Sequence, residues 1–255
     1  MKQLLFSLPV FFLIFNACQP NKQLSTDKAL NSVYAQNILK DYLITKKQKI
    51  KTRYEYNVES HIDTTLMRIT NYDSLGRIVQ IEEIGDKEFG EIIYSTIYQN
   101  NLPSQTTIYG ADLYDIVIQF EYNETGQIIK QTESSAEPRI YTFIYNNDGL
   151  ISEMKGQTTV FVEDSLIWIP AEKYLHKYDE HGNQIETQLL RYDNQIDIIF
   201  KSRYNNKNQL IEMIDSSDEN EIIYQSYFQY KNELLIKEEN IIDGSITVYQ
   251  YEFYD

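Results

Sequence analysis

A tyrosine followed by a turn recurs along most of this chain, and it constrains the fold more than any other feature. In the full form the next residue is Asp or Asn, and a glycine lies four residues after the tyrosine. Four copies keep this form and begin at Tyr72, Tyr122, Tyr145 and Tyr178. A copy at Tyr204 places Asn208 at the glycine position, and Asn also tolerates positive φ. Shortened copies at Tyr98 and Tyr230 contain Asn in a tight turn.

This turn chemistry predicts a β-hairpin at every copy. Asp or Asn at the first turn position accepts hydrogen bonds from the backbone ahead, and the glycine takes a left-handed conformation. The tyrosines lie 26, 24, 23, 33, 26 and 26 residues apart, which leaves room for two strands per period. Residues 115–122, 139–145 and 224–230 are rich in aromatic and β-branched residues, as strands are. The chain is therefore predicted to be all-β, a continuous antiparallel meander of about 14 to 16 strands.

One face of these strands is predicted to be apolar. Strand side chains alternate between two faces, so positions two and four residues before a repeat tyrosine share its face. Counting back in this way collects Phe120, Ile118, Phe143, Tyr141, His176, Tyr174, Phe228 and Ser226. This face should carry aromatic cross-strand contacts.

Two regions fall outside the regular repeat. Residues 27–45 carry apolar side chains at helical spacing behind a Ser25-Thr26-Asp27 cap, which predicts a short helix that covers the first sheet edge. The 33-residue spacing holds residues 158–170 and predicts a longer hairpin.

The first 18 residues indicate export and lipidation. A lysine and a short apolar stretch make residues 1–17 a signal peptide, since a membrane-spanning helix needs about 20 apolar residues. The sequence Phe15-Asn16-Ala17-Cys18 resembles a lipobox, which implies a lipid on Cys18. Cys18 is the only cysteine, so no internal disulfide is expected. Residues 18–26 would form a lipidated tether, and residues 46–255 the hairpin domain.

The repeat resembles the YD repeat of the RHS family over residues 50–255. Such repeats form strand pairs in a long coiling β-sheet, often a shell around a toxin domain. Because the sequence ends at Tyr254-Asp255, a delivery role for a toxin is not expected here.

The chain offers little catalytic chemistry. Its net charge of −15 disfavours nucleic acid. His61, His176 and His181 form no catalytic pattern, and no nucleotide-binding or metal-binding motif occurs. The acidic pairs at residues 82–83, 163–164 and 238–239 are adjacent, and strand neighbours point to opposite faces. No catalytic residue, metal or cofactor is therefore expected.

Trp168, the only tryptophan, lies in the longer hairpin and is the predicted ligand contact. The favoured function is a non-enzymatic envelope protein, lipid-anchored to the outer membrane and facing the periplasm, that presents the repeat sheet as a binding or scaffolding surface. Its partner would be a polysaccharide, another envelope protein or a toxin of the repeat family. The alternative is a glycan-active enzyme, which would need paired carboxylates about 5 to 10 Å apart.

Overall fold

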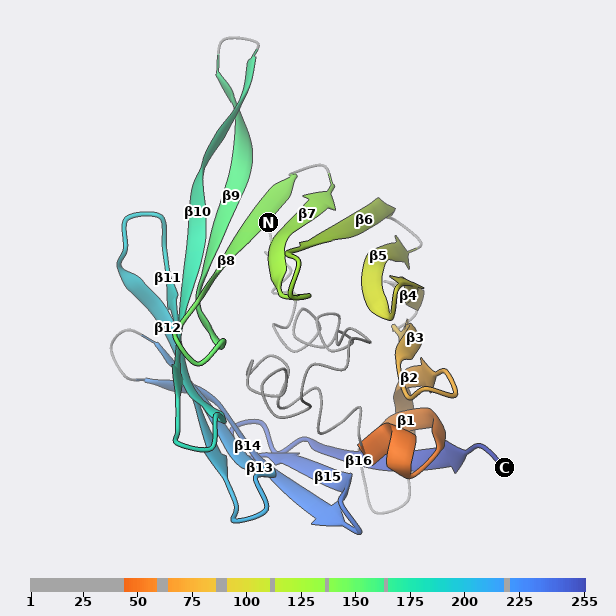
Figure 1. Ribbon diagram of the computed structural model, residues 1–255. Helices are drawn as coiled ribbons and strands as arrows, with labels where there is room; N and C mark the ends of the chain where they lie inside the picture. Colours follow the sequence, from red (N-terminus) through yellow and green to blue (C-terminus); the bar gives the residue numbers. More distant parts are fainter. Residues whose placement is uncertain are drawn as a thin grey trace.

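The chain forms a closed barrel of 16 antiparallel strands (Figure 1). The computed structural model describes residues 44–58, 64–85, 91–110, 113–135, 138–162, 165–217 and 221–255. Each strand pairs with its neighbours in sequence, and β1 (Ile50–Val58) pairs with β16 (Ile246–Phe253). The predicted all-β meander is confirmed. The long coiling sheet that the YD-repeat resemblance implied is wrong, because the pairing of the first and last strands closes the wall.

Most strands have 7 to 10 residues. Between β1 and β16 the wall contains β2 (Thr64–Tyr72), β3 (Ile78–Ile84), β4 (Glu91–Gln99), β5 (Leu102–Gly110), β6 (Leu113–Tyr122), β7 (Ile128–Ser134), β8 (Arg139–Tyr145), β9 (Ile151–Val162), β10 (Ser165–Tyr178), β11 (Gln184–Leu190), β12 (Ile196–Tyr204), β13 (Leu210–Ser217), β14 (Ile222–Lys231) and β15 (Leu234–Asn240). β9 and β10 are the exceptions, with 12 and 14 residues, and they protrude beyond the wall (Figure 1). This is the longer hairpin that the sequence predicted.

The repeat turns have the geometry that their residues predict. In five copies the Asp or Asn side chain accepts hydrogen bonds from the backbone N–H groups two and four residues ahead, as from Thr125 and Gln127 to Asn123 at 3.0 and 2.9 Å. The left-handed residues and their φ angles are Gly76 (82°), Gly126 (82°), Gly149 (79°), Gly182 (73°) and Asn208 (57°). The hairpin interpretation is confirmed at these turns.

The repeat tyrosines join one hairpin to the next. Five of their hydroxyls donate to a backbone carbonyl near the start of the preceding strand, which belongs to the preceding hairpin. The donors and acceptors are Tyr98 to Ile78 (2.6 Å), Tyr122 to Pro103 (2.8 Å), Tyr145 to Ile128 (2.7 Å), Tyr178 to Ile151 and Tyr204 to Gln184 (3.1 Å). Phenylalanine could pack similarly but could not make this bond, which explains why the repeat uses tyrosine.

The inner face of the barrel carries an apolar cluster, and the outer face carries ion pairs together with exposed apolar side chains such as Ile97. Ile118 and Phe120 of β6 are 1% and 9% exposed, and they belong to an inner cluster. The other buried members of this cluster are Ile81, Tyr94, Ile108, Tyr141, Phe143, Ile151 and Met154. Glu121, between two inward residues, points outward and pairs with Lys130 at 2.8 Å. The predicted apolar face is therefore the inner wall.

The predicted N-terminal helix is tested only at its end. Residues 44–47 form a helical turn, whereas residues 27–43 of the prediction lie outside the described residues. Its expected role is wrong, because β1 is paired with β16 and leaves no first edge to cover. Within the part of the chain that the structure describes, no helix is long and apolar enough to cross a membrane.

Candidate functional site

Charged and phenolic side chains line the inner wall toward the end of the barrel opposite the repeat turns. Arg68, Tyr94, Tyr141 and Tyr174 each precede a repeat tyrosine by four residues, so they lie at a similar depth. We call the full set of inward groups at this depth the girdle. Its members are Glu55, Arg68, Glu83, Tyr94, Glu133, Arg139, Tyr141, Glu172, Tyr174, Asp215, Tyr224, Glu238 and Tyr249.

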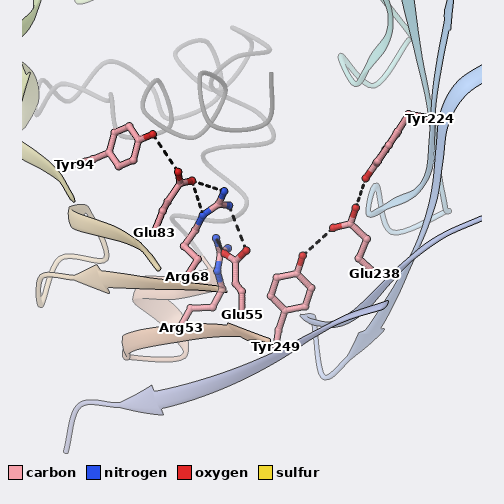
Figure 2. Close-up of polar contacts among 8 residues, drawn as sticks. All are labelled: Arg53, Glu55, Arg68, Glu83, Tyr94, Tyr224, Glu238 and Tyr249. Atoms are coloured by element: carbon pink, nitrogen blue, oxygen red, sulfur yellow. Dashed lines mark hydrogen bonds and ion pairs between the residues drawn. The ribbon is translucent and has the colours of Figure 1, made fainter. Parts of the chain in front are cut away.

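An arginine–carboxylate chain occupies the girdle on β1 to β4 (Figure 2). Glu55 receives hydrogen bonds from Arg53 at 2.7 Å and from Arg68 at 3.3 Å. Arg68 also donates twice to Glu83, at 2.6 and 3.1 Å, and Tyr94 donates to Glu83 at 3.3 Å. These contacts follow from the register, because Glu55, Arg68 and Glu83 are direct partners on adjacent strands.

The local electrostatics keep the two arginines of this cluster charged. Burial alone would lower the pKa of Arg68, but the nearby carboxylates of Glu55 and Glu83 outweigh it and raise that pKa. Burial, with a contribution from Glu83, raises the pKa of Tyr94 well above its usual value. The arginines therefore stay cationic and Tyr94 stays a neutral donor at physiological pH.

A second group continues the girdle on the neighbouring strands β14 to β16, where Tyr249 is the register partner of Glu55 (Figure 2). Tyr224 and Tyr249 both donate to the Glu238 carboxylate, at 2.5 and 2.9 Å. Asp215 is the register partner of Tyr224, and burial raises its pKa to about 6. Its Oδ1 atom is buried without a hydrogen-bond partner.

The third part of the girdle lies on β7 to β10 and contains a β-bulge. Pro170 pairs with Gln157 and Lys173 pairs with Lys155, so two residues of β10 oppose Gly156 alone. Glu172 lies at this bulge and faces inward in phase with Tyr174, and its carboxylate accepts from Tyr141 at 2.6 Å and from Arg139 at 3.3 Å.

Gly156 leaves space for the Glu172 carboxylate because it has no side chain. A Cβ atom there would lie 2.9 Å from the Glu172 backbone oxygen and 3.2 Å from both the Glu172 carboxyl carbon and Cε1 of Tyr141. Any larger residue would displace the bulge or the tyrosine ring. The sequence is thus fitted locally to hold a carboxylate against a phenol.

Several inward polar atoms have no hydrogen-bond partner. Gln131 is fully buried, and neither its amide oxygen nor its amide nitrogen is bonded. Oε2 of Glu133 is buried and unbonded, and burial raises the pKa of this carboxyl. Arg53 Nε, Thr70 Oγ1 and His176 Nε2 are further unbonded atoms on this wall. Buried polar groups are normally satisfied, so these unbonded atoms are candidate contacts for water or a polar ligand.

The structure separates the adjacent acidic pairs as predicted. Glu83 faces inward to Arg68, and Glu238 faces inward to two tyrosines. Glu239 instead pairs with Lys237 at 2.6 Å. Residues 163–164 lie outside the described part.

The other predicted residues lie away from the girdle or cannot be placed. Trp168 is 44% exposed on the protruding β9–β10 hairpin, beside Leu166 and Ile167 at 52% and 43%. His176 is buried and shares a 3.0 Å hydrogen bond with Thr187, whereas His181 lies on an exposed turn. Cys18 and His61 lie outside the described residues. In the described ranges, no group of three or more His, Cys, Asp or Glu could hold a metal ion.

Sequence reasoning did not predict the girdle. Its signal was nonetheless present: Arg68 and Arg139 share strand phase with the repeat tyrosines, where an apolar core would not place arginine. Glu172 carries the same signal, because it precedes Tyr178 by six residues, as Arg139 precedes Tyr145.

Comparison with known proteins identifies a similar fold. No family model and no curated protein matches the chain. A porin-like protein from Bacteroides uniformis superposes with a TM-score of 0.50 at 12% identity, covering 80% of this chain and 97% of that chain. A porin-like protein from Bacteroides vulgatus gives a TM-score of 0.49 at 11% identity, with 80% and 99% covered.

This likeness corrects the resemblance drawn from the repeat. The chain has a closed barrel like that of the porin-like protein from Bacteroides uniformis. The assignment to an RHS-type YD-repeat protein, with an open sheet of hairpins, is therefore wrong. The tyrosine turns are real, but they build successive hairpins of a barrel wall.

Proposed function

We propose that this chain is a non-enzymatic protein of the cell envelope, anchored to the outer membrane by lipid on Cys18 and facing the periplasm. Its barrel stands in water and binds a polar ligand on the inner wall, at the girdle. This narrows the expected binding or scaffolding surface of the repeat sheet to its inner face. The observation that carries the proposal is the set of ion pairs on the outer face of the wall.

The outer face favours a barrel surrounded by water. Cross-strand ion pairs lie on this face immediately before three repeat tyrosines: Glu121–Lys130 (2.8 Å), Lys177–Glu186 (2.7 Å) and Arg203–Glu212 (3.0 Å). A barrel that spans a membrane carries an outward apolar band about 25 Å tall, and charges in it are costly. The inward side chains, by contrast, include the apolar cluster.

The girdle favours binding over catalysis. Glu55 and Glu83 both bind Arg68, and Glu238 is held between two tyrosines. Such carboxylates are restrained by donors and do not form the opposed acid and nucleophile that a glycosidase needs. A barrel of 16 strands is also wider than its wall side chains alone fill, so an inner ligand is sterically reasonable.

A second candidate function is passage of solutes through the outer membrane. The fold likeness to a porin-like protein favours it, and the carboxylates of the girdle would then favour cations. The outer ion pairs weigh against it.

Replacing Cys18 by serine separates the two functions. A chain held only by lipid should move from the membrane fraction to the soluble fraction in the Cys18→Ser variant, because its only anchor is lost. Cys18 is the only cysteine, so no other thiol is affected. If the variant stays in the membrane fraction after alkaline carbonate washing, the barrel itself is in the bilayer and the proposal is wrong.

A further inference from the structure

We infer that the β7–β10 part of the girdle binds an uncharged, hydroxyl-rich ligand, a sugar ring. The subsite consists of Gln131, Glu133, Arg139, Tyr141 and Glu172. The inference rests on the proposed function, since it requires a ligand inside the barrel.

The wall brings these five side chains together on three strands. Gln131 and Glu133 are two residues apart on β7, and Tyr141 and Arg139 are their register partners on β8. Glu172 reaches the same place from β10, where it bonds to Tyr141 and Arg139. The bulge and Gly156 serve no hairpin turn, so the local sequence is fitted to this cluster.

The subsite leaves both donors and acceptors unused. Gln131 is fully buried with an unbonded amide, which supplies two N–H donors and one acceptor. Glu133 is 9% exposed, and its Oε2 supplies a further acceptor. A buried polar group without a partner destabilises the fold, so a ligand that bonds to these atoms recovers that cost.

The mixture of groups selects the ligand class. An anion would be repelled by the carboxylates of Glu133 and Glu172. A cation would be repelled by the guanidinium of Arg139. A hydroxyl group both donates and accepts, so adjacent hydroxyls match the amide and carboxylate together. Gln131 also lies in register between Phe120 and Tyr141, so an aromatic residue flanks it on each neighbouring strand.

The test measures binding of defined sugars to the purified full-length chain in detergent. The probes are maltohexaose, cellohexaose, xylohexaose and chitohexaose, followed by saturation-transfer NMR and titration calorimetry. We expect at least one probe to bind, and we expect Gln131→Met and Glu133→Gln each to weaken it tenfold or more. Glu121→Gln, the outward neighbour on the same hairpin, is the matched control and should leave the affinity unchanged.

Folding is checked separately. Gln131→Met removes a buried amide without a partner and keeps the side-chain length, so this variant should unfold at the same or a higher urea concentration than the parent. A folded Gln131→Met variant that binds the sugar as tightly as the parent overturns the inference. So does failure of all four probes, which would leave ordered water as the occupant. Neither result alters the fractionation of the Cys18→Ser variant, so the two proposals fail independently.

Discussion

At the residue scale, the repeat tyrosine stabilises the barrel through its hydroxyl as well as its ring. The sequence placed these tyrosines on the buried face correctly, because strand alternation is local. It could not show that each hydroxyl reaches a carbonyl of an earlier strand, since that contact depends on how far neighbouring hairpins are offset.

Replacing Tyr145 by phenylalanine should lower the free energy of unfolding by about 1 kcal/mol, because the Ile128 carbonyl loses its donor. Urea unfolding measures this as a lower midpoint at an unchanged slope. Tyr192→Phe is the control, since Tyr192 is 75% exposed. Equal midpoints for Tyr145→Phe and the parent would show that the hydroxyl contributes nothing.

His176 should make the barrel sensitive to mild acid. Burial lowers its pKa from 6.5 to about 4, so between these values the unfolded chain binds a proton that the folded chain does not. Stability contributed by neutral His176 is therefore present above pH 6.5 and is lost as the pH falls toward 4, by about 2 kcal/mol at pH 5.

The measurement compares urea unfolding at pH 7 and pH 5 for the parent and for His176→Gln. The variant should lose less stability between the two pH values than the parent does. His181→Gln, on an exposed turn, should behave like the parent. An identical loss in His176→Gln and the parent would remove His176 as the source.

At the element scale, the hairpins could be predicted well because the residues that specify each turn lie next to one another in the sequence. The turn residues fix where each chain reversal occurs, and the long β9–β10 hairpin follows from the 33-residue spacing. The bulge in β10 could not be predicted, because no turn residue marks it. It became visible only from the pairing of β10 with β9.

The outer part of the β9–β10 hairpin is unlike the rest of the wall. β8 pairs with β9 only as far as Thr158, and β11 pairs with β10 only from Lys173 onward. Leu166, Ile167 and Trp168 are exposed beyond these pairings. Exposed strand edges with apolar side chains are typical sites of contact with another chain.

Trp168 therefore stays the predicted contact for a partner on this hairpin. Trp168→Ala should change the free energy of unfolding by less than about 0.5 kcal/mol, as exposed substitutions usually do. It should reduce recovery of an envelope partner in affinity capture, measured against Tyr192→Ala as the control. Equal recovery by both variants would exclude Trp168 from that contact.

At the scale of the whole molecule, closure of the sheet into a barrel could not be predicted from the sequence. Hairpin rules state how each strand pairs with the next, but the pairing of β1 with β16 depends on twist and stagger accumulated over the entire wall. Closure also determines that the girdle faces an enclosed interior. The alternation of apolar and polar residues was predicted correctly, yet in a closed sheet it separates inside from outside.

The most direct test of the proposed function is to measure whether water or lipid surrounds the outer wall of the barrel. Single cysteines that replace Met67, Gln119 and Lys201, exposed on β2, β6 and β12, would carry nitroxide labels on the lipid-anchored chain bound to liposomes. Power-saturation measurements compare collisions with a water-soluble nickel complex and with oxygen. A barrel standing in water predicts high nickel accessibility at all three positions. High oxygen and low nickel accessibility at these positions would place the wall in lipid and contradict the account.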